Sequence, residues 1–248
     1  MRHAPCPGRR RASVAPTGAT PRVLGLALLA VLLAGCAASD DRPSRESRDA
    51  SRGPVDLADA LPERATTGTY RAVAGDAQGE EFPLRITPAS LDADGVFEIE
   101  GLRRSRLVRT GDGSIHVAEV IDRREQVRVV YEPAAVMLPD ALRVGQVMRM
   151  EIEMRVYRLA DGSRQASGGG TIELELVEVG LFDTPMGQVE GYRIREHHDL
   201  RLSLARVDVR VDAIYARGLG PVRLSTTRRT RTLGLFASEE REVLERIE

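Results

Sequence analysis

The chain has no lysine, no asparagine and no tryptophan, and only 4% of its 248 residues are aromatic. Without lysine it has no Schiff-base residue, no lysine nucleophile and no P-loop lysine. All basic side chains are therefore arginine, an excess that we attribute to the codon preference of a GC-rich genome rather than to a ligand. The scarcity of aromatic rings argues against a surface that stacks sugars.

Cysteine is also scarce, since Cys6 and Cys36 are the only two. Residues 1–35 carry five arginines and no acidic residue, whereas the chain from Cys36 onward carries 31 arginines and 37 acidic residues, a net charge of −6. A mildly acidic body with interspersed arginine lacks the basic face that neutralises phosphates. We therefore expect no nucleic acid among the partners.

An apolar run of thirteen residues, Val23 to Gly35, follows the arginines at positions 9–11. This order is typical of an export signal. As a helix the run would span about 20 Å, which is too short for the ~30 Å hydrocarbon core of a bilayer. We therefore interpret residues 1–35 as a signal peptide rather than as a permanent membrane span.

The sequence Leu33-Ala34-Gly35-Cys36 resembles the lipobox of bacterial lipoproteins. The resemblance implies that Cys36 is acylated, with palmitate-type chains, and becomes the mature N-terminus. Two or three acyl chains anchor a protein stably in a membrane, whereas one does so only marginally. Ala37 stands where inner-membrane lipoproteins of proteobacteria have Asp, so the resemblance points to the periplasmic side of the outer membrane in a diderm organism. A disulfide would need Cys6, which lies in the segment to be removed.

Residues 36–64 are rich in Asp, Arg, Ser, Ala and Pro and have little that could bury surface. We predict three parts: a signal peptide (1–35), a lipidated cysteine with a flexible tether (36–64), and one antiparallel β domain (65–248). One turn of helix is expected within residues 55–61, before Pro62.

The clearest strand pattern runs from Met148 to Tyr157, where apolar and charged residues alternate. In a strand, alternate side chains point to opposite faces, so the apolar set shares one face. Residues 171–179 repeat the pattern, and the Gly-rich stretch 161–170 between them is expected to be a flexible hairpin loop. The apolar set of the first strand consists of Met148, Met150, Ile152, Met154 and Val156.

Shorter runs with the same period predict most of the remaining strands. They lie at Tyr70–Ala74, Phe82–Thr87, Val96–Glu100, Ser105–Thr110, Ile115–Ile121, Gln126–Tyr131, Val189–Glu196, Leu200–Leu204, Val207–Tyr215 and Val222–Leu233. Consecutive strands without intervening helices indicate an all-β domain. We expect a single antiparallel, strongly curved sheet or incomplete barrel rather than a two-sheet sandwich, with a short C-terminal helix at Glu239–Ile247.

Ligand-type residues cluster only at Glu196-His197-His198-Asp199. Because adjacent side chains on a strand face opposite ways, the two histidines could not both bind one metal without a bulge, and we interpret the cluster as a polar strand junction. The chain lacks nucleophile-elbow, zinc-protease, phosphate-loop and Cys-x-x-Cys motifs. The sequence therefore indicates no catalytic residue, no metal and no cofactor, and we expect a protein that is not an enzyme.

Three segments resemble exported β-rich domains of poorly defined function in bacterial envelopes, the TapB-like group among them. They are the strand lead-in 138–145, the turn 183–187 before a strand, and Tyr215-Ala216-Arg217-Gly218-Leu219-Gly220-Pro221-Val222. The resemblance implies a fold and brings no catalytic residue with it. In the last segment Gly218 and Gly220 are expected to allow positive φ or close approach at a tight reversal.

We therefore predict a lipid-anchored envelope protein that acts non-enzymatically through a curved β-sheet. In one version the sheet forms an apolar cleft for a lipid-like ligand, lined by Met148, Met150, Ile152 and Met154. In the other it binds an envelope protein partner. A structural or assembly lipoprotein with a solid β core, or a hydrolase with an unrecognised site, are the alternatives.

Overall fold

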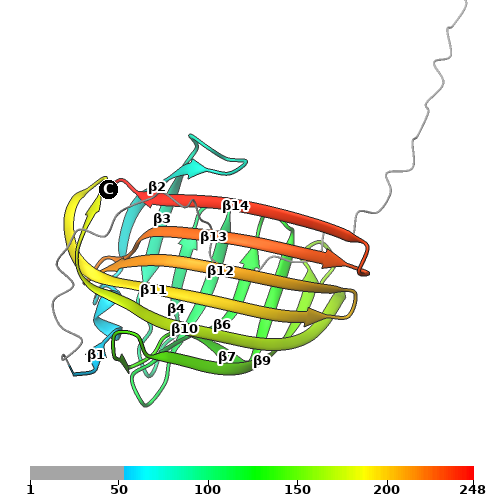
Figure 1. Cartoon of the computed structure of the whole chain (residues 1–248), viewed down its shortest axis with the longest axis horizontal. Helices are drawn as coiled ribbons and strands as arrows, with labels where there is room; N and C mark the ends of the chain where they lie inside the picture. The colour runs from blue at the N-terminus through cyan, green and yellow to red at the C-terminus, as the bar shows by residue number, and fades with distance from the viewer. Residues whose placement is uncertain (1–52) are drawn as a thin grey trace, which may run out of the picture.

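Twelve antiparallel strands form a closed barrel in the computed structural model, which describes residues 53–248 (Figure 1). The all-β class predicted from the sequence is confirmed, and the predicted curved sheet closes completely. Around the barrel the order is β10-β11-β12-β13-β14-β2-β3-β4-β5-β6-β7-β9, with β9 paired to β10. The barrel strands are β2 (Thr66–Ala74), β3 (Glu81–Thr87), β4 (Gly95–Ile99), β5 (Arg103–Arg109), β6 (Ile115–Asp122), β7 (Val127–Leu138), β9 (Val147–Arg158), β10 (Arg164–Thr184), β11 (Gly187–Leu202), β12 (Ala205–Ala216), β13 (Gly220–Thr232) and β14 (Phe236–Arg246).

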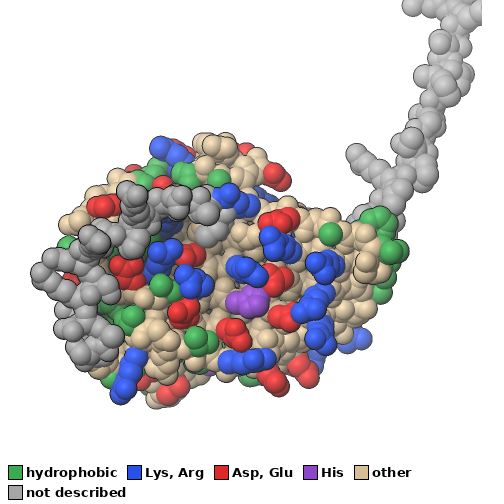
Figure 2. Space-filling view, viewed as in Figure 1, with side chains coloured by type: hydrophobic (Ala, Val, Ile, Leu, Met, Phe, Trp, Pro, Cys, Tyr) green, Lys and Arg blue, Asp and Glu red, His purple; other side chains and the backbone are tan. Residues whose placement is uncertain are grey.

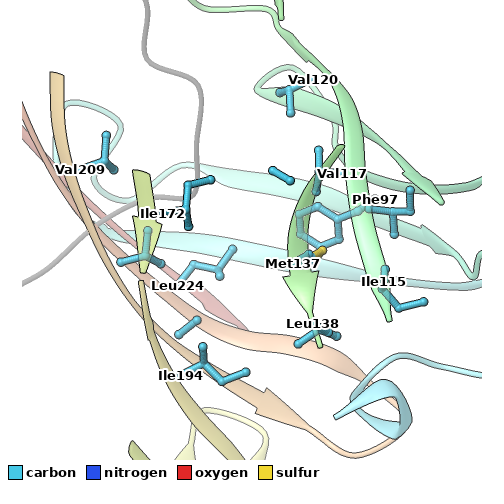
Figure 3. Packing of buried hydrophobic residues seen from close by; sticks show 14 of the residues in the cluster. Phe97, Ile115, Val117, Val120, Met137, Leu138, Ile172, Ile194, Val209 and Leu224 are labelled. Atoms are coloured by element: carbon cyan, nitrogen blue, oxygen red, sulfur yellow. The ribbon is translucent and has the colours of Figure 1, made fainter. Parts of the chain in front are cut away.

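The barrel has two unlike walls. Figure 1 shows the long strands β10–β14 in front, running across β3, β4, β6 and β7 behind them. The inward side chains of both walls meet in a single large core cluster, part of which is drawn in Figure 3. Phe97, Ile115, Val117 and Leu138 come from the rear wall, and Ile194 is one of those from the front wall. The barrel interior is therefore filled by packed side chains.

Strand β9 follows the predicted alternation, since Ile152, Met154 and Val156 are buried and the residues between them are exposed. The hairpin after it differs from the prediction. Strand β10 already begins at Arg164, so residues 168–170 lie in a strand rather than in a loop. Glycine is needed there because the strands approach closely: a Cβ at Gly170 would meet the backbone oxygen of Asp199 at 2.0 Å.

The predicted C-terminal helix at Glu239–Ile247 is wrong, because these residues belong largely to strand β14. Val243 and Leu244 are adjacent and both buried, which breaks the period of two and imitates a helical face. The two side chains still alternate, because β14 pairs with β13 without a register shift and only Leu244 belongs to the core cluster; the bulge in the pairing with β2 is on the β2 side, at Val73. Pairing with β13 on one side and β2 on the other outweighs the local helical pattern.

The pairing of β14 with β2 closes the barrel. Leu244 lies opposite Ala72, and Arg246 lies opposite Tyr70. The guanidinium of Arg246 is buried and donates to three backbone oxygens, those of Glu248 (2.7 Å), Leu219 (2.6 Å) and Thr67 (3.0 Å). The last barrel strand in the chain is thus tied to the first.

The packed part of the chain starts before the predicted domain boundary at residue 65. Strand β1 (Val55–Asp56) pairs with β8 (Ala141–Leu142), and a 3-10 turn, η1 (Ala58–Ala60), follows it. Leu57 and Leu61 are buried in the core cluster. The expectation of a turn of helix within residues 55–61 is confirmed, but these residues are packed rather than part of a flexible tether.

Residues 1–52 are outside the described part of the chain, and with them lie Cys36, the predicted signal peptide and most of the predicted tether. Among residues 53–248 no helix has the length and apolar character needed to span a bilayer. Gly218 and Gly220 have φ of 68° and 85°, and a Cβ on Gly220 would meet Cδ1 of Ile86 at 2.6 Å. The predicted positive φ and close approach at this reversal are confirmed.

Candidate functional site

A cleft of about 320 Å³ opens between β14 and the loops that follow β2, β4 and β6. Its volume is at the lower end of the range of small-molecule sites. Polar side chains from both barrel walls converge on it. The cleft is lined by Asp76, Leu102, Arg103, Asp122, Arg124, Glu125, Thr226, Arg228, Glu239, Glu240, Arg241 and Glu242.

Arg103 is one of two buried arginines that line the cleft, and the other is Arg228. Arg103 begins β5 and points into the barrel, so only 9% of the residue is exposed. Its Nε and Nη2 atoms are buried and find no hydrogen-bond partner among the described residues. These two atoms form one edge of the guanidinium, the planar fork that matches the two oxygens of a carboxylate.

Burial controls the electrostatics of this arginine. It lowers the pKa of Arg103, while the charges of Glu242 and Asp122 act in the opposite direction. A buried cation with free donors is costly unless an anion compensates it. Arg103 can therefore bind an anionic group that enters through the cleft.

Most other charges of the cleft are already paired. The Nη2 atom of Arg228 donates to Glu240 Oε2 at 2.6 Å and to Glu125 Oε1 at 3.3 Å. Arg124 Nη1 donates to Glu242 Oε1 at 2.6 Å. These contacts neutralise the charges at the edge of the cleft and hold β14 against the loop after β6.

Asp122 lies directly across the strand ladder from Arg103. Its Oδ1 accepts the backbone N–H of Glu125 at 2.9 Å. Burial raises the pKa of Asp122, and the neighbouring charge of Glu125 raises it further. The deep end of the cleft thus offers a donor fork on Arg103 and, beside it, a carboxyl acceptor on Asp122.

A second set of polar groups lies deeper in the barrel. Glu196 and His198 are 2% and 1% exposed, and Nε2 of His198 is 3.0 Å from Oε2 of Glu196. Burial, followed by the charge of Glu196, raises the pKa of the Tyr131 and Tyr215 hydroxyls. The charge of Arg103 acts on the pKa of Tyr215 in the opposite direction.

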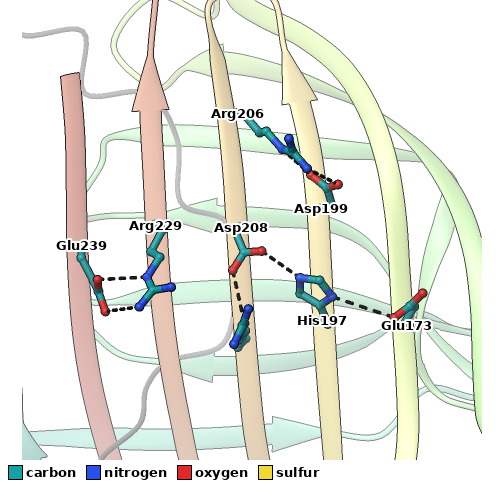
Figure 4. Close-up of polar contacts among 8 residues, drawn as sticks. Glu173, His197, Asp199, Arg206, Asp208, Arg229 and Glu239 are labelled. Carbon is teal, nitrogen blue, oxygen red and sulfur yellow. Dashed lines mark hydrogen bonds and ion pairs between the residues drawn. The ribbon is translucent and has the colours of Figure 1, made fainter. Parts of the chain in front are cut away.

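The predicted cluster of residues 196–199 is divided between the two faces of β11, as the alternation argument required. His197 points outward, with Nε2 2.8 Å from Asp208 Oδ2 and Nδ1 3.9 Å from Glu173 Oε2 (Figure 4). Asp199 also points outward and binds Arg206 through both carboxylate oxygens. The predicted strand junction is instead the middle of one continuous strand.

Within residues 53–248 no group of three His, Cys, Asp or Glu side chains is placed to hold a metal ion. The four residues predicted to line an apolar cleft do point inward. Ile152 and Met154 are 3% and 1% exposed, and Met148 and Met150 are partly buried against the same core. They pack within the barrel, and the lining of the Arg103 cleft comes from other residues.

Sequence reasoning missed Arg103. It stands in the run Arg103-Arg104-Ser105-Arg106, which has the composition of a solvent-exposed face. The signal that could have found it is the period of two: Arg103, Ser105 and Leu107 share a face, and Leu107 is fully buried.

No protein-family model matches the chain, and no curated protein matches its sequence. Two solved structures are similar to it. One, described as a proposed lipoprotein of Parabacteroides distasonis, has 10% identity and a TM-score of 0.39, with 78% of this chain and 99% of that chain covered. The other, described as a proposed exported protein with a YmcC-like fold from Bacteroides fragilis, has 10% identity and a TM-score of 0.40, with 79% and 99% covered.

Proposed function

We propose that the protein is a lipid-anchored, non-enzymatic binding protein of the bacterial envelope, and that its barrel binds a small carboxylate-bearing solute at Arg103. The observation that carries the proposal is the buried guanidinium edge of Arg103, whose Nε and Nη2 have no partner in the described chain and which lines an open cleft. A bidentate carboxylate would supply both missing hydrogen bonds.

The charges around the cleft favour a singly charged ligand. Six acidic residues line it (Asp76, Asp122, Glu125, Glu239, Glu240 and Glu242), against four arginines. A doubly charged phosphate would be repelled by this excess, whereas a monocarboxylate that carries a donor, such as an ammonium or hydroxyl group, can also bind Asp122. We therefore infer an amino-acid-like or hydroxy-acid-like ligand.

A polar ligand is favoured over the lipid-like ligand considered first. Met148, Met150, Ile152 and Met154 belong to or pack against the continuous core, so an acyl chain entering there would have to displace packed side chains. The cleft that is open has charged walls. A partner protein could bind the outer surface of the barrel while the Arg103 cleft holds its ligand.

The binding proposal is tested by ligand-observed NMR with acetate, L-alanine and glycolate as probes. We expect L-alanine and glycolate to bind more tightly than acetate, and Arg103→Gln to weaken all three by at least about tenfold, since a charged bidentate contact is lost. The matched control is Arg104→Gln, because Arg104 is the exposed neighbour on the same strand. Equal binding by the wild type and Arg103→Gln would overturn the proposal, as would conversion of a probe into product.

The anchor is tested separately. Cys36→Ala should leave the protein without label in cells fed a clickable palmitate analogue, and should move it out of the membrane fraction. An acyl-labelled band that persists in this variant would overturn the lipoprotein assignment. Sucrose-gradient separation of the two membranes of a diderm host then tests the expected outer-membrane location.

A further inference from the structure

The tips of two neighbouring hairpins form an exposed apolar rim. Leu204 ends the β11–β12 hairpin and is 44% exposed, while Leu233, Leu235 and Phe236 end the β13–β14 hairpin and are 61%, 82% and 69% exposed. The two tips touch, because the N–H of Leu233 donates to the carbonyl oxygen of Leu204 at 2.9 Å. Figure 2 shows hydrophobic atoms gathered at the end of the molecule where Figure 1 places the β13–β14 tip.

The backbone conformation at the tip of the β13–β14 hairpin does not favour leucine at position 233. Leu233 and Gly234 have φ of 52° and 70°. A turn with two positive φ angles favours asparagine, aspartate or glycine at its first position, and a bulky apolar residue is sterically costly there. The turn therefore tolerates strain while presenting an apolar side chain to the exterior.

Arginines stand directly behind the rim. Arg201, Arg206 and Arg231 lie side by side across β11, β12 and β13, in register and all exposed. Like charges placed opposite one another weaken a sheet, so this row is not explained by fold stability. Segments 201–206 and 231–238 contain these three arginines and no acidic residue.

Acidic residues begin only further from the tips. Asp199 binds Arg206 at 2.8 and 2.9 Å, which partly compensates the row, and Glu239 binds Arg229 on the next pair of strands (Figure 4). The chain from Cys36 onward is acidic overall, so the positive potential of the rim is local. It acts over a Debye length of about 8–10 Å at physiological salt.

We propose that this rim, composed of Leu204, Leu233, Leu235 and Phe236 with the row Arg201, Arg206 and Arg231, docks on an anionic lipid surface. The apolar residues occupy the outermost points of convex hairpins, which suits insertion into a deformable bilayer interface. Arg206 and Arg231 each stand two residues from the nearest tip leucine, about 6–7 Å along the strand, and Arg201 stands three residues from Leu204. When the leucines reach the acyl boundary, the guanidinium groups therefore lie at the depth of the lipid phosphates.

Docking by the rim would complement the predicted anchor at Cys36 without depending on it. The core and all strand pairings of the barrel lie within residues 53–248. A chain of residues 37–248 therefore contains the whole barrel and lacks the acylation site, which separates the two modes of membrane binding. Failure of the Arg103 proposal would not affect this test, because the rim shares no residue with the cleft.

The first experiment is co-sedimentation of residues 37–248 with vesicles of phosphatidylcholine alone, or with about 30% phosphatidylglycerol, in about 0.1 M salt. We expect binding to the anionic vesicles only. Leu235→Ser combined with Phe236→Ser should abolish it, and Arg201→Gln combined with Arg231→Gln should weaken it by about 30-fold. The matched controls should bind as the wild type does: Leu181→Ser, which is 64% exposed at a different hairpin, and Arg85→Gln with Arg104→Gln.

A second measurement uses the absence of tryptophan from the chain. Leu235→Trp introduces a single indole, whose emission should shift to the blue and be quenched by brominated lipid when anionic vesicles are added. Leu181→Trp should show neither effect. The proposal is overturned if the wild type binds neither vesicle type or binds both equally. It is also overturned if analytical ultracentrifugation shows dimers that the substitutions in the rim abolish.

Discussion

Gly170→Ala is the sharpest test of how closely the barrel strands approach one another. An added Cβ would lie 2.0 Å from the backbone oxygen of Asp199 and 2.9 Å from Cα of Leu200. Real Cβ contacts stay above 3.0 Å, so β10 and β11 would have to separate by about 1 Å, and no flexible side chain can absorb the shift. Overpacking of this kind costs about 1–3 kcal/mol, and a clash with rigid backbone belongs at the upper end.

The expected loss of about 2–3 kcal/mol corresponds to a fall in Tm of about 4–12 °C for a domain of this size. The matched control is Gly180→Ala in the same strand, where an added Cβ meets nothing within 4 Å. It should be neutral or raise stability by about 0.4–1 kcal/mol, because alanine restricts the unfolded chain. Differential scanning calorimetry on residues 37–248 measures both. If both variants had the same Tm as the wild type, the close strand approach at Gly170 would be refuted.

Three further changes test the interior. Arg246→Leu removes three charge-assisted hydrogen bonds to backbone oxygens and should cost about 3 kcal/mol or more in chemical unfolding, whereas the exposed Arg241→Leu should cost little. Because burial raises the pKa of Asp122 above 3.8, the native state holds its proton longer than the unfolded state, so stability falls as pH rises through that window. Asp122→Asn should remove this decline, and parallel pH curves for the two proteins would contradict the assignment. Met154→Ala should lower the free energy of unfolding by about 2–5 kcal/mol if the side chain belongs to the core. Met148→Ala should lower it by less, because Met148 is only partly buried. A loss near zero for Met154→Ala would favour a cleft at this position instead.

The strands could be predicted where one face is buried without interruption. Between Met148 and Tyr157 the sequence alternates because the inner positions are buried or partly buried against the core and the outer ones are exposed. The all-β class follows from many such runs. Closure of the sheet could not be predicted, because it depends on the pairing of β14 with β2, whose residues are distant in the chain.

The errors have local causes. At Val243 and Leu244 two adjacent residues are both buried although they lie on opposite faces of β14, so the period of two is lost in the sequence. At Gly168 and Gly170 a glycine-rich composition indicated a loop, whereas the glycines serve close contact between strands. The inward direction of Arg103 follows from the period of two, but the cleft that it lines could not be predicted, because that cleft brings β5 together with residues of β13 and β14 that are distant in the chain.

The seam between β14 and β2 has a consequence for how the chain reaches its native state. Until residues 236–246 are available, β13 and β2 each present an unpaired edge of backbone donors and acceptors. Such edges are templates for pairing between chains. A chain whose β14 has not yet paired is therefore more exposed to aggregation than the closed barrel, and closing it requires contacts between segments that are distant in the chain, which is slow.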